Sequence, residues 1–272
     1  MKRRPLIDEK DIIRYQRDGV VALHGLFSQH WIDCLRAGVE TNLAEPGEFA
    51  REHGEGRGKF FDDYCNWKRI PEFHEFVHGS YAAEIAAAAM GSPIAQFFHE
   101  HVLVKEPGTV KRTPWHQDAP YFCVDGVQTL SFWIPLDPVP QHVCPEFIAG
   151  SHNWGKLFYP RSFFDDTDYN YDGDNFVTIP DIDASRDNYN IHSWALEPGD
   201  AILFHFRTVH GAPANPGGGR RRGFALRWLG DDARFVLRPG STSPPYPGID
   251  QVTGERMRED WFPIIWCVSP GV

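Results

Sequence analysis

The chain has 272 residues, 42% of them hydrophobic, which is enough to bury a substantial core in one large domain and excludes a disordered chain. Its formal net charge of −10 argues against nucleic acid as a partner, because phosphate binding needs a basic face. Five scattered cysteines, with no signal-peptide pattern and no long apolar run, lead us to expect a cytoplasmic protein without a membrane partner.

The first 93 residues are predicted to be mainly helical. Ser28 is a suitable N-cap, and Gly91 ends an alanine-rich run that is typical of a helix. We expect this part to buttress one face of a sheet domain. The predicted elements are helices over residues 8–18, 28–43 and 71–90, and a strand over residues 19–23.

From about residue 94 the pattern changes to short apolar runs bounded by Pro, Gly and Asp. Many short strands without intervening helices favour an antiparallel barrel or jelly roll. The predicted strands are residues 95–105, 129–136, 146–148, 201–206 and 223–229. We expect one domain over residues 1–272, with a jelly-roll core over 94–235, a lid insertion over 154–193 and a C-terminal extension over 236–272.

The segment Pro114-Trp-His-Gln-Asp118 contains two candidate metal ligands, His116 and Asp118, two residues apart. Side chains at i and i+2 of a strand point to the same face, so both could bind one ion while Gln117 points away. Two imidazoles and one carboxylate form the facial triad of non-heme Fe(II) oxygenases. The pattern therefore predicts such a site once a distant histidine is added.

Two histidines compete for the third position. His205 lies in mid-strand between two phenylalanines, which is typical of a core or wall residue. His210 lies where the strand ends and the chain turns, a more usual place for a functional side chain. We interpret His210 as the ligand. The cluster Arg220-Arg-Arg222 then begins the next strand and could supply the cation that binds the far carboxylate of 2-oxoglutarate.

The chain also resembles the phytanoyl-CoA dioxygenase family of Fe(II)/2-oxoglutarate oxygenases. The resemblance covers most of the chain. It is carried by Leu103-Val-Lys-Glu-Pro-Gly108, Trp115-His-Gln-Asp-Ala-Pro-Tyr-Phe122, Ser131-Phe-Trp-Ile-Pro-Leu-Asp137, Gly150-Ser-His152, Gly199-Asp200, His210-Gly-Ala-Pro-Ala-Asn215 and Arg222-Gly-Phe-Ala-Leu-Arg-Trp228.

This resemblance implies a mainly β fold with flanking helices, a double-stranded β-helix (jelly roll, cupin-like). His116, Asp118 and His210 match the iron ligands of the family. The family has a basic residue that binds 2-oxoglutarate. Arg222 matches its position better than Arg221 does, although the arginine run leaves a one-residue ambiguity. Further cosubstrate-contacting positions are matched by Ser131, Trp133 and His101.

The implied activity uses Fe(II), 2-oxoglutarate and O2 to oxidise a small-molecule substrate, with release of succinate and CO2. Because the acidic ligand Asp118 is present, hydroxylation is favoured over halogenation. Some relatives carry serine two residues after the distal histidine; Ala212 stands there in this chain. The acidic, aromatic stretch 154–193 is interpreted as a lid that would repel the phosphates of an acyl-CoA, with a solvated insertion as the alternative.

Two other readings of the residues remain. A metal-dependent hydrolase or isomerase on a cupin-like barrel would use the same three ligands with zinc or manganese, but would not need the arginine on the following strand. A non-catalytic jelly-roll binding protein would need neither the intact triad nor that arginine. We keep both as alternatives to the oxygenase.

Overall fold

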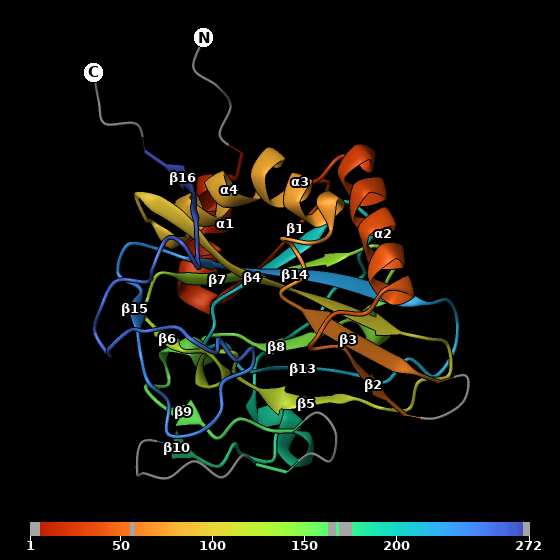
Figure 1. The fold of residues 1–272 in the computed structure, drawn as a ribbon. Helices are drawn as coiled ribbons and strands as arrows, with labels where there is room; N and C mark the ends of the chain where they lie inside the picture. The colour runs from red at the N-terminus through yellow and green to blue at the C-terminus, as the bar shows by residue number, and fades with distance from the viewer. Residues whose placement is uncertain (1–5, 55–57, 163–166, 169–175, 269–272) are drawn as a thin grey trace.

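The computed structural model describes residues 6–54, 58–162, 167–168 and 176–268. Four helices cover the outer face of a large sheet (Figure 1). Their bounds are α1 Glu9–Asp18, α2 Gln29–Ala44, α3 Pro71–Gly79 and α4 Ala82–Met90. No helix in the described part of the chain combines the length and apolar character that crossing a membrane requires.

The large sheet contains eight antiparallel strands. Seven lie in the order β1–β12–β7–β14–β4–β3–β2, and β16 pairs with the start of β4. Their bounds are β1 Val20–Leu23, β2 Arg51–His53, β3 Phe60–Tyr64, β4 Ile94–Lys105, β7 Thr129–Pro135, β12 Ala201–Phe204, β14 Arg221–Leu229 and β16 Ile264–Cys267.

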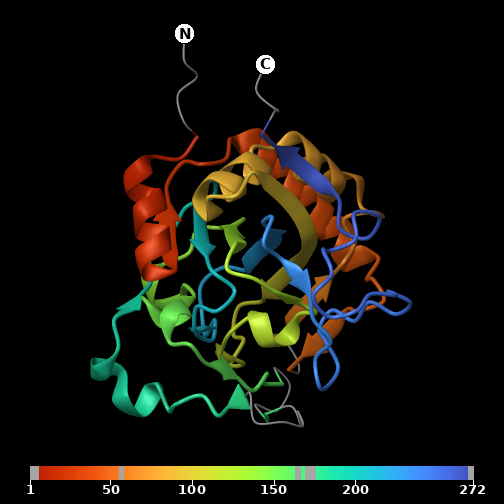
Figure 2. The ribbon, with the colours of Figure 1, turned by 90° about the vertical axis from the view of Figure 1, so that its left-hand side faces the viewer.

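A second, four-stranded sheet lies on the other side of the large sheet from the helices (Figure 1). Its order is β11 Ile191–His192, β8 Glu146–Ile148, β13 His210–Ala212 and β5 Thr113–His116. Short pairs β6 Val124–Asp125 with β15 Arg234–Phe235, and β9 Leu157–Phe158 with β10 Phe176–Val177, flank it. The chain around β9 and β10 lies at the end of the molecule opposite the helices in both views (Figures 1 and 2).

Strand β14 separates the two halves of the fold by simple alternation. Its residues Phe224, Leu226 and Trp228 point to the helices and join the main apolar core, where the rings of Phe73 and Phe224 lie 4.7 Å apart. The alternate residues point between the two sheets instead. The interior of the jelly roll is therefore a separate space, in which polar side chains can gather.

The expected fold class is confirmed, with two differences in the first 93 residues. Strands β2 and β3 lie in this part and extend the large sheet, so it is less helical than predicted. The helix expected over 71–90 is two helices, because Ser80 adopts an extended conformation (φ −82°, ψ 170°) after Gly79, a weak helix former.

Candidate metal and cosubstrate site

Three buried side chains from the smaller sheet and the turn after it gather at one point. The Nε2 atoms of His116 and His210 each lie 3.7 Å from Oδ1 of Asp118, and one ligand atom from each of the three residues lies within 4.8 Å of the others. His116 on β5 and His210 on β13 are direct cross-strand partners. The pairing register of two short strands therefore brings together residues that are 94 positions apart in sequence.

The backbone fixes the tautomers of both histidines. Nδ1 of His116 lies 2.8 Å from the carbonyl of Pro114, and Nδ1 of His210 lies 2.9 Å from the carbonyl of Thr208. A carbonyl only accepts, so each Nδ1 carries the proton and each Nε2 presents a lone pair. Burial, followed by the neighbouring His116, lowers the pKa of His210 to about 3, which keeps its imidazole neutral.

Asp118 stands in the first turn after β5 rather than on the strand, with φ −71° and ψ −41°. The turn still aims its carboxylate at the histidines. Gln117 points away, as expected, and its amide donates to the carbonyl of Arg207 at 2.8 Å. The side chains thus point in the directions that the i, i+2 spacing predicted, although only His116 lies on the strand.

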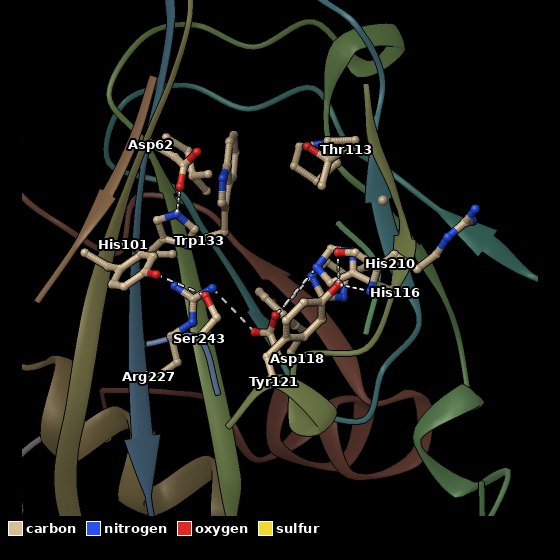
Figure 3. A pocket seen from close by; sticks show the side chains of 18 of the residues that line it. Asp62, His101, Thr113, His116, Asp118, Tyr121, Trp133, His210, Arg227 and Ser243 are labelled. Carbon is tan, nitrogen blue, oxygen red and sulfur yellow. Dashed lines mark hydrogen bonds and ion pairs between the residues drawn. The ribbon is translucent and has the colours of Figure 1, made fainter. Parts of the chain in front are cut away.

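A buried arginine that sequence reasoning did not select lies beside the carboxylate. Nη2 of Arg227 is 3.5 Å from Oδ2 of Asp118 (Figure 3). Its Nε and Nη1 are buried and have no hydrogen-bond partner among the residues that the structure describes. Ser131 donates to the same oxygen at 3.0 Å. Burial alone would raise the pKa of Asp118, but the charge of Arg227 and the two histidines outweigh it and lower that pKa strongly.

The large sheet forms the facing wall of the pocket as a ladder of cross-strand neighbours. Each step of two residues along a strand is about 6.6 Å. Nearest to His116, Asp118 and His210 the wall is formed by His99 and Arg227, with Ser131 buried behind them. The next level is Tyr64, His101, Ala225 and Trp133, followed by Asp62 and Leu103 with Gly223 beside them. The last level, Phe60, Lys105 and Arg221, lies beyond the residues that line the pocket.

The last level holds two buried cations. Lys105 and Arg221 are cross-strand partners, 2% and 6% exposed, and neither forms an ion pair with any carboxylate in the described part of the chain. Nζ of Lys105 donates to the hydroxyl of Thr113, which lines the pocket, at 3.2 Å. Burial lowers the pKa of Arg221 to about 10, and burial together with Arg221 lowers that of Lys105.

The expectation for Arg222 is corrected by this alternation. Arg222 lies on the opposite face of β14, where it forms an ion pair with Asp137 at 2.6 Å and another with Glu40 at 2.8 Å. It does not line the pocket. The choice between Arg221 and Arg222 is therefore critical, because a shift of one residue along a strand turns a side chain to the other face.

The remaining expected site residues divide between the pocket and its support. Trp133 and His101 line the pocket. Ser131 is fully buried behind the lining and bonds Asp118, so the structure gives it a supporting contact rather than a place on the pocket surface. His205 lies outside the pocket with its Nε2 2.9 Å from the carbonyl of Val127, which agrees with its interpretation as a core residue.

Segments far from the triad in sequence complete the pocket. Arg51, His53, Asp62 and Tyr64 come from β2 and β3, and Ser243 comes from the C-terminal extension. The expected lid contributes Arg161. Most of the aromatic and acidic residues on which the lid argument depended lie outside the described residues: Phe163, Phe164, Asp165, Asp166, Tyr169, Tyr171, Asp172 and Asp174.

Comparison with known proteins identifies relatives of this chain. A family model described as Phytanoyl-CoA dioxygenase (PhyH) matches residues 15–223. A probable phytanoyl-CoA dioxygenase of Caenorhabditis elegans is 26% identical over 183 residues, which is 63% of this chain and 55% of that protein. The chain thus spans about half the length of this curated relative.

Solved structures share the fold over nearly the whole chain. The non-heme alpha ketoglutarate dependent epimerase SnoN from nogalamycin biosynthesis has a TM-score of 0.73 at 23% identity, covering 95% of this chain and 98% of that one. The carbocyclase SnoK of the same biosynthesis has a TM-score of 0.73 at 22% identity, covering 95% and 96%. EctD from S. alaskensis, solved with 2-oxoglutarate and 5-hydroxyectoine, has a TM-score of 0.68 at 18% identity, covering 91% and 84%.

Proposed function

Because this chain belongs to the phytanoyl-CoA dioxygenase family, whose members are Fe(II)/2-oxoglutarate-dependent oxygenases, we propose that it hydroxylates a small-molecule metabolite and releases succinate and CO2. The cofactors that this membership implies are Fe(II) and 2-oxoglutarate, with O2 as the oxidant. The identity of the substrate and the choice of hydroxylation over another oxidation are parts of the proposal.

The His-Asp-His group fits a divalent iron. Two neutral imidazoles with outward lone pairs and one anionic carboxylate converge on one point, and two nitrogens and one oxygen on one side of an ion leave its other positions open. We assign His116, Asp118 and His210 as its ligands. When bound there, iron supplies the activation of O2 that no amino-acid side chain can provide.

The cosubstrate fits between the two ends of the ladder. One end of 2-oxoglutarate would bind at the iron, and the far carboxylate would lie beside Thr113, neutralising Lys105 and Arg221. Two buried cations without a carboxylate partner are costly, so an anion supplied from outside accounts for them. Thr113 and His116 are three residues apart on β5, roughly 10 Å, a span that a five-carbon dicarboxylate fits when one end is held at the iron.

Apolar rings around the triad would exclude water from the reacting centre. Phe147 stacks on His210 with ring centroids 5.5 Å apart, and Tyr121 meets His116 edge-on at 5.7 Å. Trp133 closes the side of the pocket next to Gly223. The chain's own contribution is thus to hold the metal ligands in one tautomer, to bind both ends of the cosubstrate and to keep the centre dry.

The cationic pair is the observation that favours an oxygenase over a metal hydrolase or isomerase, which has no need for it. The direct test is formation of succinate from 2-oxoglutarate by the purified protein with Fe(II), scored with and without candidate metabolites. Asp118→Ala is the matched control that removes a metal ligand. Turnover that needs zinc or manganese but neither iron nor 2-oxoglutarate would support the hydrolase or isomerase instead.

A further inference from the structure

A second group of polar residues, two of them buried and one partly buried, lies in the pocket away from His116, Asp118 and His210 (Figure 3). Asp62 on β3 is 4% exposed and lies between two histidines. Its Oδ2 is 2.5 Å from Nε2 of His53 on β2, and its Oδ1 is 3.3 Å from Nε2 of His101 on β4. All three line the pocket, and none of them belongs to the His116, Asp118 and His210 group or to the cationic pair of Lys105 and Arg221.

The protonation states of this group follow from its contacts. Burial would raise the pKa of Asp62, but hydrogen bonds from His101 and His53 outweigh it and lower that pKa to about 2. Burial lowers the pKa of His101, with Asp62 opposing. Asp62 is therefore a carboxylate and His101 is neutral at pH 7, so Nε2 of His101 carries the proton and donates to Asp62.

The other ring nitrogen of His101 is then a hydrogen-bond acceptor. Within the described ranges no protein group is bonded to Nδ1 of His101. The ring lies on the pocket wall next to Ala225, whose small side chain leaves space between His101 and Trp133. A donor on a bound molecule can reach the acceptor through this space.

The contact between His101 and Asp62 is not needed to hold the strands β2, β3 and β4 together. The contact between His53 and Asp62 already ties β2 to β3, and main-chain pairing already joins β3 to β4. A buried carboxylate that fixes the tautomer of a pocket-facing histidine is instead an arrangement that prepares the histidine to accept a hydrogen bond in one direction.

We propose that His101, held by Asp62, binds a hydroxyl group of the organic substrate, so that this chain selects hydroxylated small molecules over analogues without that donor. This inference rests on the proposed function, since it assumes that the organic substrate occupies the same pocket. It assigns His101 to the substrate rather than to 2-oxoglutarate. His101 is a binding residue, and Asp62 is a positioning residue that acts through it.

The test uses matched pairs of compounds, each a hydroxylated metabolite and its O-methyl ether. Binding is measured by ligand-observed NMR on protein loaded with redox-inert Zn(II) and 2-oxoglutarate, so the readout does not depend on turnover. The wild-type protein should prefer the hydroxylated members. His101→Phe should lose roughly tenfold of this preference, the effect of one hydrogen bond, and His101→Gln, which can still accept, should recover part of it.

His205→Phe is the matched control, because His205 is a buried histidine outside the pocket, with its Nε2 2.9 Å from the carbonyl of Val127. It should keep the hydroxyl preference. The inference is overturned if wild type shows no preference, if His101→Phe keeps it, or if His101→Phe weakens only the binding of 2-oxoglutarate. Failure of the proposed function gives a different result, namely no succinate from the iron-loaded wild type whatever the binding preference.

Discussion

Removing the Arg221 guanidinium tests the cosubstrate site most directly. Arg221 is 6% exposed, and Lys105 would be the other cation at the far carboxylate. Truncating one partner of a buried charge pair costs about 2–5 kcal/mol. At about 1.4 kcal/mol per factor of ten, Arg221→Ala should weaken 2-oxoglutarate binding by between roughly 30-fold and several thousand-fold, with iron binding unchanged.

The assay is calorimetric titration of 2-oxoglutarate into metal-loaded protein, with succinate formation as a second measurement. Arg222→Ala is the matched control, since it removes the neighbouring arginine from the opposite face of the strand, where the partners are Asp137 and Glu40. Arg221→Lys should recover part of the affinity. Equal losses in the two alanine variants, at unchanged melting temperature, would refute the assignment.

Three further outcomes are expected. His210→Ala should abolish iron binding while His205→Ala retains it, as measured by metal analysis after dialysis; the reverse result would identify His205 as the ligand. Gly223→Ala should weaken 2-oxoglutarate binding at least tenfold, because a Cβ there would lie 2.5 Å from the indole of Trp133 and displace it; unchanged binding would contradict this. Glu100 has its pKa raised to about 8 by burial, so its stabilising contribution is complete below about pH 4.5 and is lost as pH rises through 8. Thermal unfolding from pH 5 to 9 should thus show a steeper loss of stability in wild type than in Glu100→Gln, and parallel curves would disprove it.

The three residues that we propose as metal ligands could be selected from sequence because their signals are local. His116 and Asp118 lie two residues apart, and His210 lies near a turn after the predicted strand 201–206, where the structure begins the separate strand β13. Pairing of β5 with β13 then brings these local features together. Sequence could not show that Asp118 lies in a turn, but the turn preserves the direction that a strand would have given.

Predicting the residues at the far end of the cosubstrate site depended on knowing which side chains of strand β14 face the interior. Arg221, Arg222 and Arg227 all lie on β14, and only the apolar residues Phe224 and Leu226 reveal which face meets the helices. Had that alternation been applied to the arginines, Arg221 and Arg227 would have been selected together. The strand was predicted to begin at Gly223, and so the arginine run lay outside the pattern that assigns faces.

The second polar group could not be found in the same way. Asp62 and His101 are 39 residues apart and meet only because β3 pairs with β4. The segment Phe60-Phe-Asp-Asp-Tyr64 has no clean alternation, since all five residues are buried. Helical patterns on both sides then favoured a helical interpretation of the region. Strand β3, which contributes to the pocket wall, was therefore not predicted.

If 2-oxoglutarate binds as we propose, the ladder of β4 and β14 also fixes the length of the cosubstrate that the site accepts. Backbone hydrogen bonds set the spacing of its levels, so the distance between Arg227, which lies beside Asp118, and the pair Lys105 and Arg221 cannot adjust to a longer or shorter molecule. The chain should therefore measure the length of a 2-oxo diacid, accepting five carbons and discriminating against the four of oxaloacetate and the six of 2-oxoadipate. Competition of these acids with 2-oxoglutarate would measure how the affinity depends on the length of the diacid. Equal affinities would mean that the anion site is not rigid.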